Sequence, residues 1–292
     1  MYKLLLPLVA VGLSACGGGS TTDPNNFIIS TPTGTPLTAT QAKSFAQTSS
    51  GAPFTTGGGA STFTLTRTNS NAEHLSTYDL TINGVTYNLS PAPGNSSTSS
   101  NNSFFDTKNG TTATVFLNEN LPNASIANVQ LSNSGASEQL LGIVGDRTPA
   151  ATLTTIANAT YTGIGEVSID RANGLFDDAP NSVANLTANF TGGTLNGSIN
   201  VIDNATGENG GAFDIVGGSI GLSGTISGNG FTLTPDFSSM NVNGVTNISA
   251  QSIDGGFYGT DAENAVGVGL SLGQSAVAND VVIYTRIQAT KN

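Results

Sequence analysis

Residues 254–273 decide how the C-terminal half of the chain folds, and they read DGGFYGTDAENAVGVGLSLG. Phe257 and Tyr258 follow a glycine pair and would point to opposite faces of a strand. The polar residues 259–264 indicate a tight connection. After it, four apolar residues alternate with Gly or Ser at period two: Val266, Val268, Leu270 and Leu272. The stretch therefore predicts a strand, a turn and a second strand.

The same stretch resembles the barrel signature of surface lipoproteins related to transferrin-binding protein B. The residues that match this signature are Gly255, Gly256, Phe257, Tyr258, Gly259, Ala262, Glu263 and Gly267. Val266 and Gly269 depart from it, because that family has a second glycine and an aromatic residue there. The resemblance implies that residues 254–273 close an antiparallel β-barrel.

Regular strand patterns precede this stretch from residue 159 onward. Tyr161, Val167 and Ile169 share one face of a predicted strand, and residues 186–190 and 195–201 alternate around a turn at 192–193. Counting these segments with the final run at 281–287 gives roughly eight strands, which suits a small closed barrel. We therefore expect residues 151–292 to form an eight-stranded antiparallel β-barrel domain.

Residues 41–150 are expected to form a separate β-rich domain that resembles a handle. Asn83-Gly84 stands between two alternating runs, which is a strong signal for a two-residue hairpin. Residues 41–47 are expected to form a short helical turn, and residues 91–103 a polar loop. The Pro-containing polar segment 145–155 predicts the boundary between the domains. The whole chain is thus predicted to be all-β.

The N-terminus reads as a bacterial lipoprotein signal. Residues 1–15 combine Lys3 with a short apolar run, and Leu13-Ser14-Ala15 precede Cys16, the single cysteine. This pattern implies cleavage before Cys16 and acylation of both its sulfur and its new amine, with palmitate-type chains anchoring the protein. Residues 16–40 are rich in Gly, Ser, Thr and Pro, which predicts a flexible lipidated tether. Gly17 in place of Asp favours the outer membrane.

Composition excludes one class of partner. The chain has 292 residues, a formal net charge of −11 and only 9% charged residues. Such a surface repels the phosphate backbone, so no nucleic acid partner is expected. The abundance of Gly and the absence of Trp fit an extracellular β protein with many turns.

The residues that could support catalysis are few. His74 is the single histidine and stands in a polar segment, so neither a catalytic triad nor a zinc site is expected. The acidic groups Asp177-Asp178, Asp203 with Glu208, and Asp261 with Glu263 lack EF-hand spacing. Weak calcium binding in one of these turns stays open. We expect no enzyme activity, no catalytic residue, no resident metal and no cofactor.

By the resemblance, the protein is expected at the cell surface, held in the outer membrane by its lipid. Its partner would be an extracellular protein from the host or the environment, bound through loops of the barrel and the handle. By the same resemblance, that partner could carry iron or haem. An outer-membrane receptor or an export partner would also fit. The alternative is a structural or adhesive envelope lipoprotein with no discrete soluble ligand. The sequence identifies no ligand-binding residues.

Overall fold

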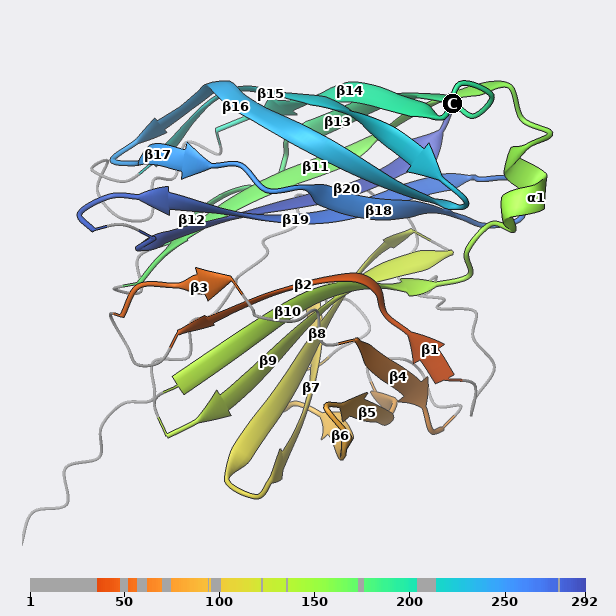
Figure 1. Ribbon diagram of the computed structural model, residues 1–292. Helices are drawn as coiled ribbons and strands as arrows, with labels where there is room; N and C mark the ends of the chain where they lie inside the picture. Colours follow the sequence, from red (N-terminus) through yellow and green to blue (C-terminus); the bar gives the residue numbers. More distant parts are fainter. Residues whose placement is uncertain are drawn as a thin grey trace, which may run out of the picture.

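The computed structural model describes residues 36–47, 52–56, 62–69, 75–93, 95, 101–121, 123–134, 136–172, 176–203, 214–277 and 279–292. Two β-sheets account for two packed domains, one above the other in Figure 1. Within the described ranges, α1 (Ala150–Leu153) lies on the connection between the domains, and no helix is long and apolar enough to cross a membrane. The fold class is all-β, as predicted.

The N-terminal domain is one curled ten-stranded sheet. Its strands, in chain order, are β1 (Pro36–Thr38), β2 (Thr40–Gln47), β3 (Thr55–Thr56), β4 (Phe63–Arg67), β5 (Tyr78–Ile82), β6 (Val85–Pro91), β7 (Asn101–Lys108), β8 (Thr111–Leu121), β9 (Ala124–Asn133) and β10 (Ala136–Gly145). Their spatial order is β1-β4-β5-β6-β7-β8-β9-β10-β2-β3. Because β1 and β2 are consecutive, one run of chain pairs with β4 and with β10 and draws the two sides of the sheet together.

Several expectations for this domain can now be compared with the structure. Asn83 and Gly84 form the predicted turn, with φ of 50° and 76°, and Ile82 pairs with Val85 across it. The helical turn expected at residues 41–47 is wrong, because this segment pairs with β10 as strand β2. The loop expected at 91–103 ends earlier, since β7 begins at Asn101. Residues 36–40, expected in the tether, include β1 and the start of β2.

The second sheet is closed into a barrel. Its strands are β11 (Asn158–Arg171), β12 (Phe176–Ala179), β13 (Val183–Asn189), β14 (Thr194–Val201), β15 (Asp214–Ser227), β16 (Gly230–Asn243), β17 (Thr246–Ser249), β18 (Ile253–Tyr258), β19 (Asn264–Gln274) and β20 (Val281–Lys291). Eight of them form the wall in the order β11-β13-β14-β15-β16-β18-β19-β20, and β20 pairs back onto β11. The predicted eight-stranded antiparallel barrel is confirmed.

Apolar residues alternate with polar ones along the wall strands, and their side chains fill the barrel interior, as the sequence predicted. Tyr161, Val167 and Ile169 of β11 face inward, and Leu186, Ala188, Leu195 and Ile199 meet them from β13 and β14. On β13 and β14 the outward residues Asn185, Thr187, Asn196 and Asn200 are polar and solvent-exposed. The pattern apolar-in and polar-out is what a barrel with one wet face requires.

The two domains share a buried apolar layer. It is formed by the outer face of β9 and β10 and the outer face of β18, β19 and β20. The residues from the barrel are Tyr258, Val266, Val268, Leu270, Leu272, Val282 and Tyr284, and those from the N-terminal domain include Phe54, Ile126, Leu141 and Ile143. The apolar face of β19 is thus turned toward the other domain, and its glycine face lines the barrel interior.

Phe257 and Tyr258 point to opposite sides of β18, as their adjacency predicts. The ring of Phe257 lies in the barrel core, with ring centroids 4.9 Å from Phe190, 5.4 Å from Phe231 and 5.7 Å from Tyr161. Tyr258 belongs to the layer between the domains. One strand therefore contributes a side chain to each of the two cores on its flanks.

We expect Phe257→Ala to lower the free energy of unfolding by about 3–5 kcal/mol, because the aromatic cluster cannot close around the cavity. Phe105→Ala is the matched control: Phe105 is 40% exposed on β7, so its removal should cost well under 1 kcal/mol. Urea titrations of both variants measure the difference. Equal losses would mean that the aromatic cluster does not hold the barrel closed.

Candidate functional site

The glycine pair of the signature allows two bulky groups to approach β18 from opposite sides. A side chain on Gly255 would overlap the ring of Phe231 inside the barrel and the carbonyl oxygen of Val266. A Cβ on Gly256 would lie 2.5 Å from Nη2 of Arg147, on the side of the N-terminal domain. Gly267 similarly leaves room for Ile253 and Phe231, whose atoms would stand 3.2 Å from its Cβ. These glycines set the thickness of the wall.

The second half of the signature makes the connection between β18 and β19. Gly259 has φ of +87° and Ala262 has φ of 56°, both in the left-handed region. Glu263 accepts hydrogen bonds from Thr260 Oγ1 at 2.8 Å and from the backbone N–H of Asp261 at 3.0 Å. Partial burial disfavours the charge on Glu263, but these bonds outweigh it and lower its pKa. The carboxylate therefore closes a structural turn.

Tyr161 of β11 fixes the position of this turn. Its hydroxyl donates to the carbonyl oxygen of Ala262 at 2.9 Å, inside the protein. Burial, with a smaller contribution from the negative charge of Glu263, raises the pKa of Tyr161 far above its ordinary value. Tyr161 is therefore a neutral donor at any physiological pH and has no role as a base.

Arg147 and Thr148 lie outside the signature but contact its residues, and sequence reasoning missed both. The Arg147 guanidinium lies 6.0 Å from the centroid of the Tyr258 ring, a cation–π arrangement, and Nη2 donates to Gly255 O at 3.3 Å. Thr148 donates its hydroxyl to Gly259 O at 2.7 Å and its N–H to Phe257 O at 2.9 Å. The chain between the domains is thus bound along β18. An arginine two residues before a proline gave no signal of this contact.

Polar side chains interrupt the apolar layer between the domains. Glu166, Ser168 and Asp170 project from β11, and Tyr284 and Arg286 from β20, all of them buried. Arg286 forms an ion pair with Glu166 and donates to Ser168 Oγ at 3.3 Å. Tyr284 donates to Asp170 Oδ2 at 2.9 Å. Alternation indicated that these residues share a face, but not that a second sheet covers that face.

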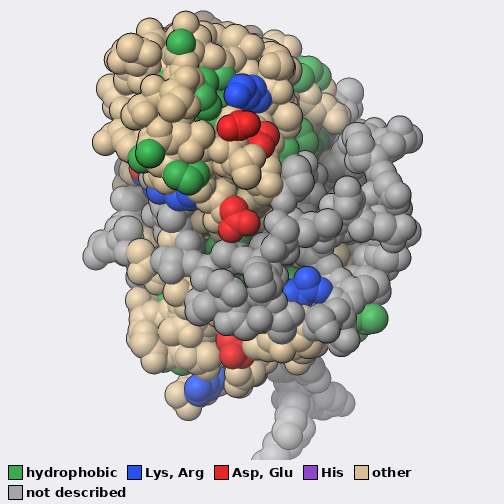
Figure 2. All heavy atoms as spheres, turned by 90° about the vertical axis from the view of Figure 1, so that its right-hand side faces the viewer, with side chains coloured by type: hydrophobic (Ala, Val, Ile, Leu, Met, Phe, Trp, Pro, Cys, Tyr) green, Lys and Arg blue, Asp and Glu red, His purple; other side chains and the backbone are tan. Residues whose placement is uncertain are grey.

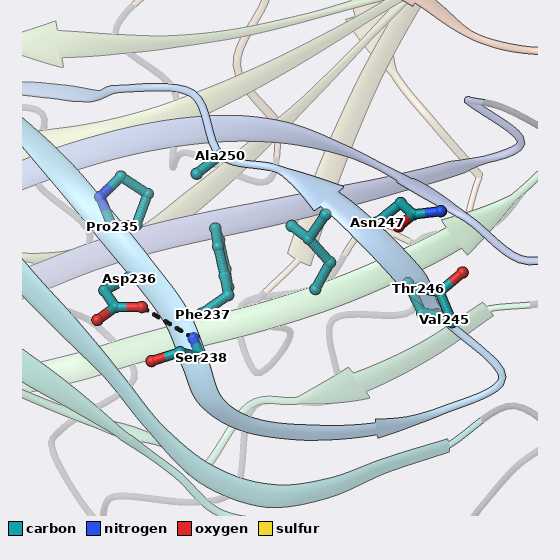
Figure 3. A pocket seen from close by; sticks show the side chains of 9 residues that line it. Pro235, Asp236, Phe237, Ser238, Val245, Thr246, Asn247 and Ala250 are labelled. Carbon is teal, nitrogen blue, oxygen red and sulfur yellow. Dashed lines mark hydrogen bonds between the residues drawn. The ribbon is translucent and has the colours of Figure 1, made fainter.

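A cleft opens in the barrel wall where β16 and β17 separate (Figure 3). β16 pairs with β18 only from Gly230 to Leu233, and its register with β15 shifts between Ser219 and Gly221. The cleft has a volume of about 490 Å³ and is lined by Pro235, Asp236, Phe237, Ser238, Val245, Thr246, Asn247, Ile248 and Ala250. Its floor is apolar because Phe237, Val245 and Ile248 pack on the barrel core.

The chemistry of this cleft is that of a contact surface. Asp236 is the single carboxylate among the nine lining residues, and hydrogen bonds from Ser238 hold its pKa below the ordinary value. Pro235 and the bulge beside it also interrupt the edge of β16, which discourages the addition of another strand. The lining can accept an apolar group, and it pairs no acid with a base.

Other sequence-predicted residues fall into two groups. Cys16, His74 and Glu208 lie outside the described residues. Asp177 accepts from the backbone N–H of Ile215 at 2.6 Å, and burial raises its pKa, with Asp214 opposing ionisation as well. Within the described ranges, no three His, Cys, Asp or Glu side chains come together to hold a metal ion.

Gly255→Ala should destabilise the protein by about 1–3 kcal/mol, since the added methyl group meets the Phe231 ring and backbone that cannot move aside. Gly221→Ala is its control, because a Cβ there would stand 3.6 Å from the nearest atom, at an exposed site in the same barrel. Thermal melts followed by circular dichroism compare the two. Indistinguishable melting temperatures would show that the signature glycine is replaceable.

Comparison with known proteins gives a family model and several solved structures. Residues 153–282 match the model described as C-lobe and N-lobe beta barrels of Tf-binding protein B. No curated protein sequence matches the chain.

Three solved structures are similar to this chain. A mutant of the vaccine antigen transferrin binding protein B from Haemophilus parasuis Hp5 is 14% identical over 86% of this chain and 44% of its own, with a TM-score of 0.48. Isotype 1 transferrin binding protein B from serogroup B Neisseria meningitidis is 18% identical over 86% of this chain and 43% of its own, with a TM-score of 0.46. A structure titled surface lipoprotein is 15% identical over 86% of this chain and 98% of its own, with a TM-score of 0.37.

This chain spans less than half the length of the two transferrin binding protein B structures. The family model covers the closed barrel from α1 to the start of β20, including the signature stretch. The C-terminal domain of this chain is therefore a β-barrel similar to the lobe barrels of transferrin-binding protein B.

Proposed function

We propose that the protein is a surface-exposed outer-membrane lipoprotein that binds a macromolecular ligand through loops of its two domains. The observation that carries the proposal is the match of residues 153–282 to the barrels of transferrin-binding protein B. The ligand class proposed from that name is an extracellular protein, such as one that carries iron or haem. A receptor or export partner in the outer membrane would act with it.

One end of the barrel offers apolar side chains to such a ligand. Ile202 follows β14, Val216 lies at the start of β15, and Val277 lies between β19 and β20. The antiparallel order of the wall places all three at the same end, and they are 38%, 46% and 52% exposed. Exposed apolar side chains at one end of a scaffold, on or beside its loops, are typical of binding surfaces.

The anchor in this proposal is the lipid on Cys16, followed by the tether. The apolar run before Leu13-Ser14-Ala15-Cys16 supports cleavage at that cysteine. Lipidated in this way, the protein would be held in the outer membrane with both domains outside the cell.

A structural or adhesive role is the second candidate, and the barrel wall favours it. Thr160, Thr187, Asn196, Ser223 and Thr234 stand opposite one another on five adjacent strands, which makes a row of exposed hydroxyl and amide groups. At the end of the barrel that faces the viewer in Figure 2, few charged side chains are visible as well. A wall of this kind could contact neutral surface material without a discrete ligand.

Mass spectrometry of the mature protein should find cleavage before Cys16 and a mass increase equal to the acyl chains on that residue. Cys16→Ala should abolish the mass increase and release the protein from membranes, because no lipid remains to hold it. Intact-cell protease treatment should remove the wild-type protein. An unmodified Cys16, or protection from protease until the outer membrane is broken, contradicts this part of the proposal.

Binding is tested with immobilised protein and two probes, iron-loaded transferrin and haemoglobin. Saturable binding of either probe is expected, and Val216→Asp with Val277→Asp should weaken it at least about tenfold, or 1.4 kcal/mol. Thr187→Asp with Thr232→Asp, which adds the same two charges to the exposed wall, is the control. Equal losses for control and loop variants contradict the assignment of the barrel end, and no saturable binding of either probe favours the adhesive role.

A further inference from the structure

The hydroxyl of Tyr284 lies between two acceptors that belong to different domains. Asp170 Oδ2 of β11 is 2.9 Å away, and Gln139 Oε1 of β10 is 3.4 Å away. All three side chains are buried. A phenol carries one proton, so Tyr284 can donate to only one of these acceptors at a time. The two hydrogen bonds compete as long as Asp170 is ionised.

The surroundings of Asp170 leave its charge poorly compensated. Tyr284 and Arg286 face it from β20, Asp178 from β12 and Gln139 from β10, and Glu166 lies along its own strand. Arg286 is engaged by Glu166 and Ser168. Asp170 Oδ1 has no hydrogen-bond partner. An ionised carboxylate at this position is therefore buried with half of its acceptor capacity unused, which is costly.

We propose that Asp170, Tyr284 and Gln139 form a protonation-dependent latch between the two domains. When Asp170 takes up a proton from water, its O–H donates to the phenol oxygen of Tyr284. The phenol O–H then donates to Gln139 Oε1, and a continuous chain of two hydrogen bonds crosses the interface. When Asp170 loses the proton, Tyr284 donates back to the carboxylate and Gln139 Oε1 loses its donor.

The sign of the pH dependence follows from the burial of Asp170. Burial raises its pKa from 3.8 to about 6, against the opposing effects of the Tyr284 hydrogen bond and the Arg286 charge, and Asp178 adds to the increase. The protonated group therefore stabilises the closed interface fully below about pH 4, and this stabilisation is lost as the pH rises through about 6. From pH 5 to pH 7.5 the equilibrium for opening the interface should increase about tenfold.

Hydrogen–deuterium exchange of the full chain tests the latch. After correction for intrinsic exchange rates, amides of residues 139–144 in β10 and 282–288 in β20 should exchange about tenfold faster at pH 7.5 than at pH 5. Amides of β14, in the wall away from the N-terminal domain, should show no such change. In Asp170→Asn the amide NH₂ replaces the carboxyl proton as a permanent donor, so the exchange of β10 and β20 should become independent of pH.

Tyr284→Phe gives a second test if Asp170→Asn does not fold. It keeps the aromatic packing but removes both hydrogen bonds, so β10 should lose its extra protection at pH 5. Three outcomes overturn the proposal: a wild-type interface whose exchange does not change with pH, an Asp170→Asn variant that keeps the wild-type pH dependence, or a Tyr284→Phe variant with wild-type protection at pH 5. A Gln139 amide turned so that Nε2 donates to Tyr284 would produce the first of these.

Discussion

The structure depends on the burial of both faces of the strands that meet between the domains. β19 and β20 line the barrel core with one face and cover β9 and β10 with the other, so nearly every residue in them is buried. Such strands cannot use the apolar-in, polar-out alternation of the rest of the wall. The two domains consequently share apolar surface that neither could expose to water, and removing one would leave the other with a large uncovered patch.

Double burial also explains where glycine is needed. A strand with a core on each side must fit large groups against both faces. In β18, Gly255 leaves space for the Phe231 ring on one side, and Gly256 leaves space for the Arg147 guanidinium on the other. β19 solves the same problem by alternation, with glycines toward the barrel interior and branched side chains toward the N-terminal domain. The glycines of the signature therefore allow close packing on both sides of the barrel wall. Its Ala262 and Glu263 form the turn between β18 and β19.

Period-two alternation and turn residues allowed the barrel, its strand faces and the Asn83-Gly84 hairpin to be predicted, because these features are local. Which face of β19 would meet the barrel core could not be predicted, since neither its apolar face nor its face of Gly and Ser carries a charged side chain. Residues 41–47 looked helical in isolation, and only pairing with β10, distant in sequence, makes them a strand. The contacts of Arg147 and the polar residues of β11 and β20 were missed for the same reason: their partners belong to another sheet.

The same interface determines which charges the outer surface presents. Arg147 and Arg286 are engaged between the domains, Lys43 forms an ion pair with Asp254 across them, and Arg171 pairs with Asp280 at the barrel end. Arg67, Lys108 and Lys291 also donate hydrogen bonds within the protein, so all seven Lys and Arg of the described residues make internal contacts. Recognition of a partner by the outer surface must then rely on neutral polar groups, backbone and the few exposed apolar side chains. Among the described residues, long-range attraction would come from carboxylates, which favours ligands with a positive patch.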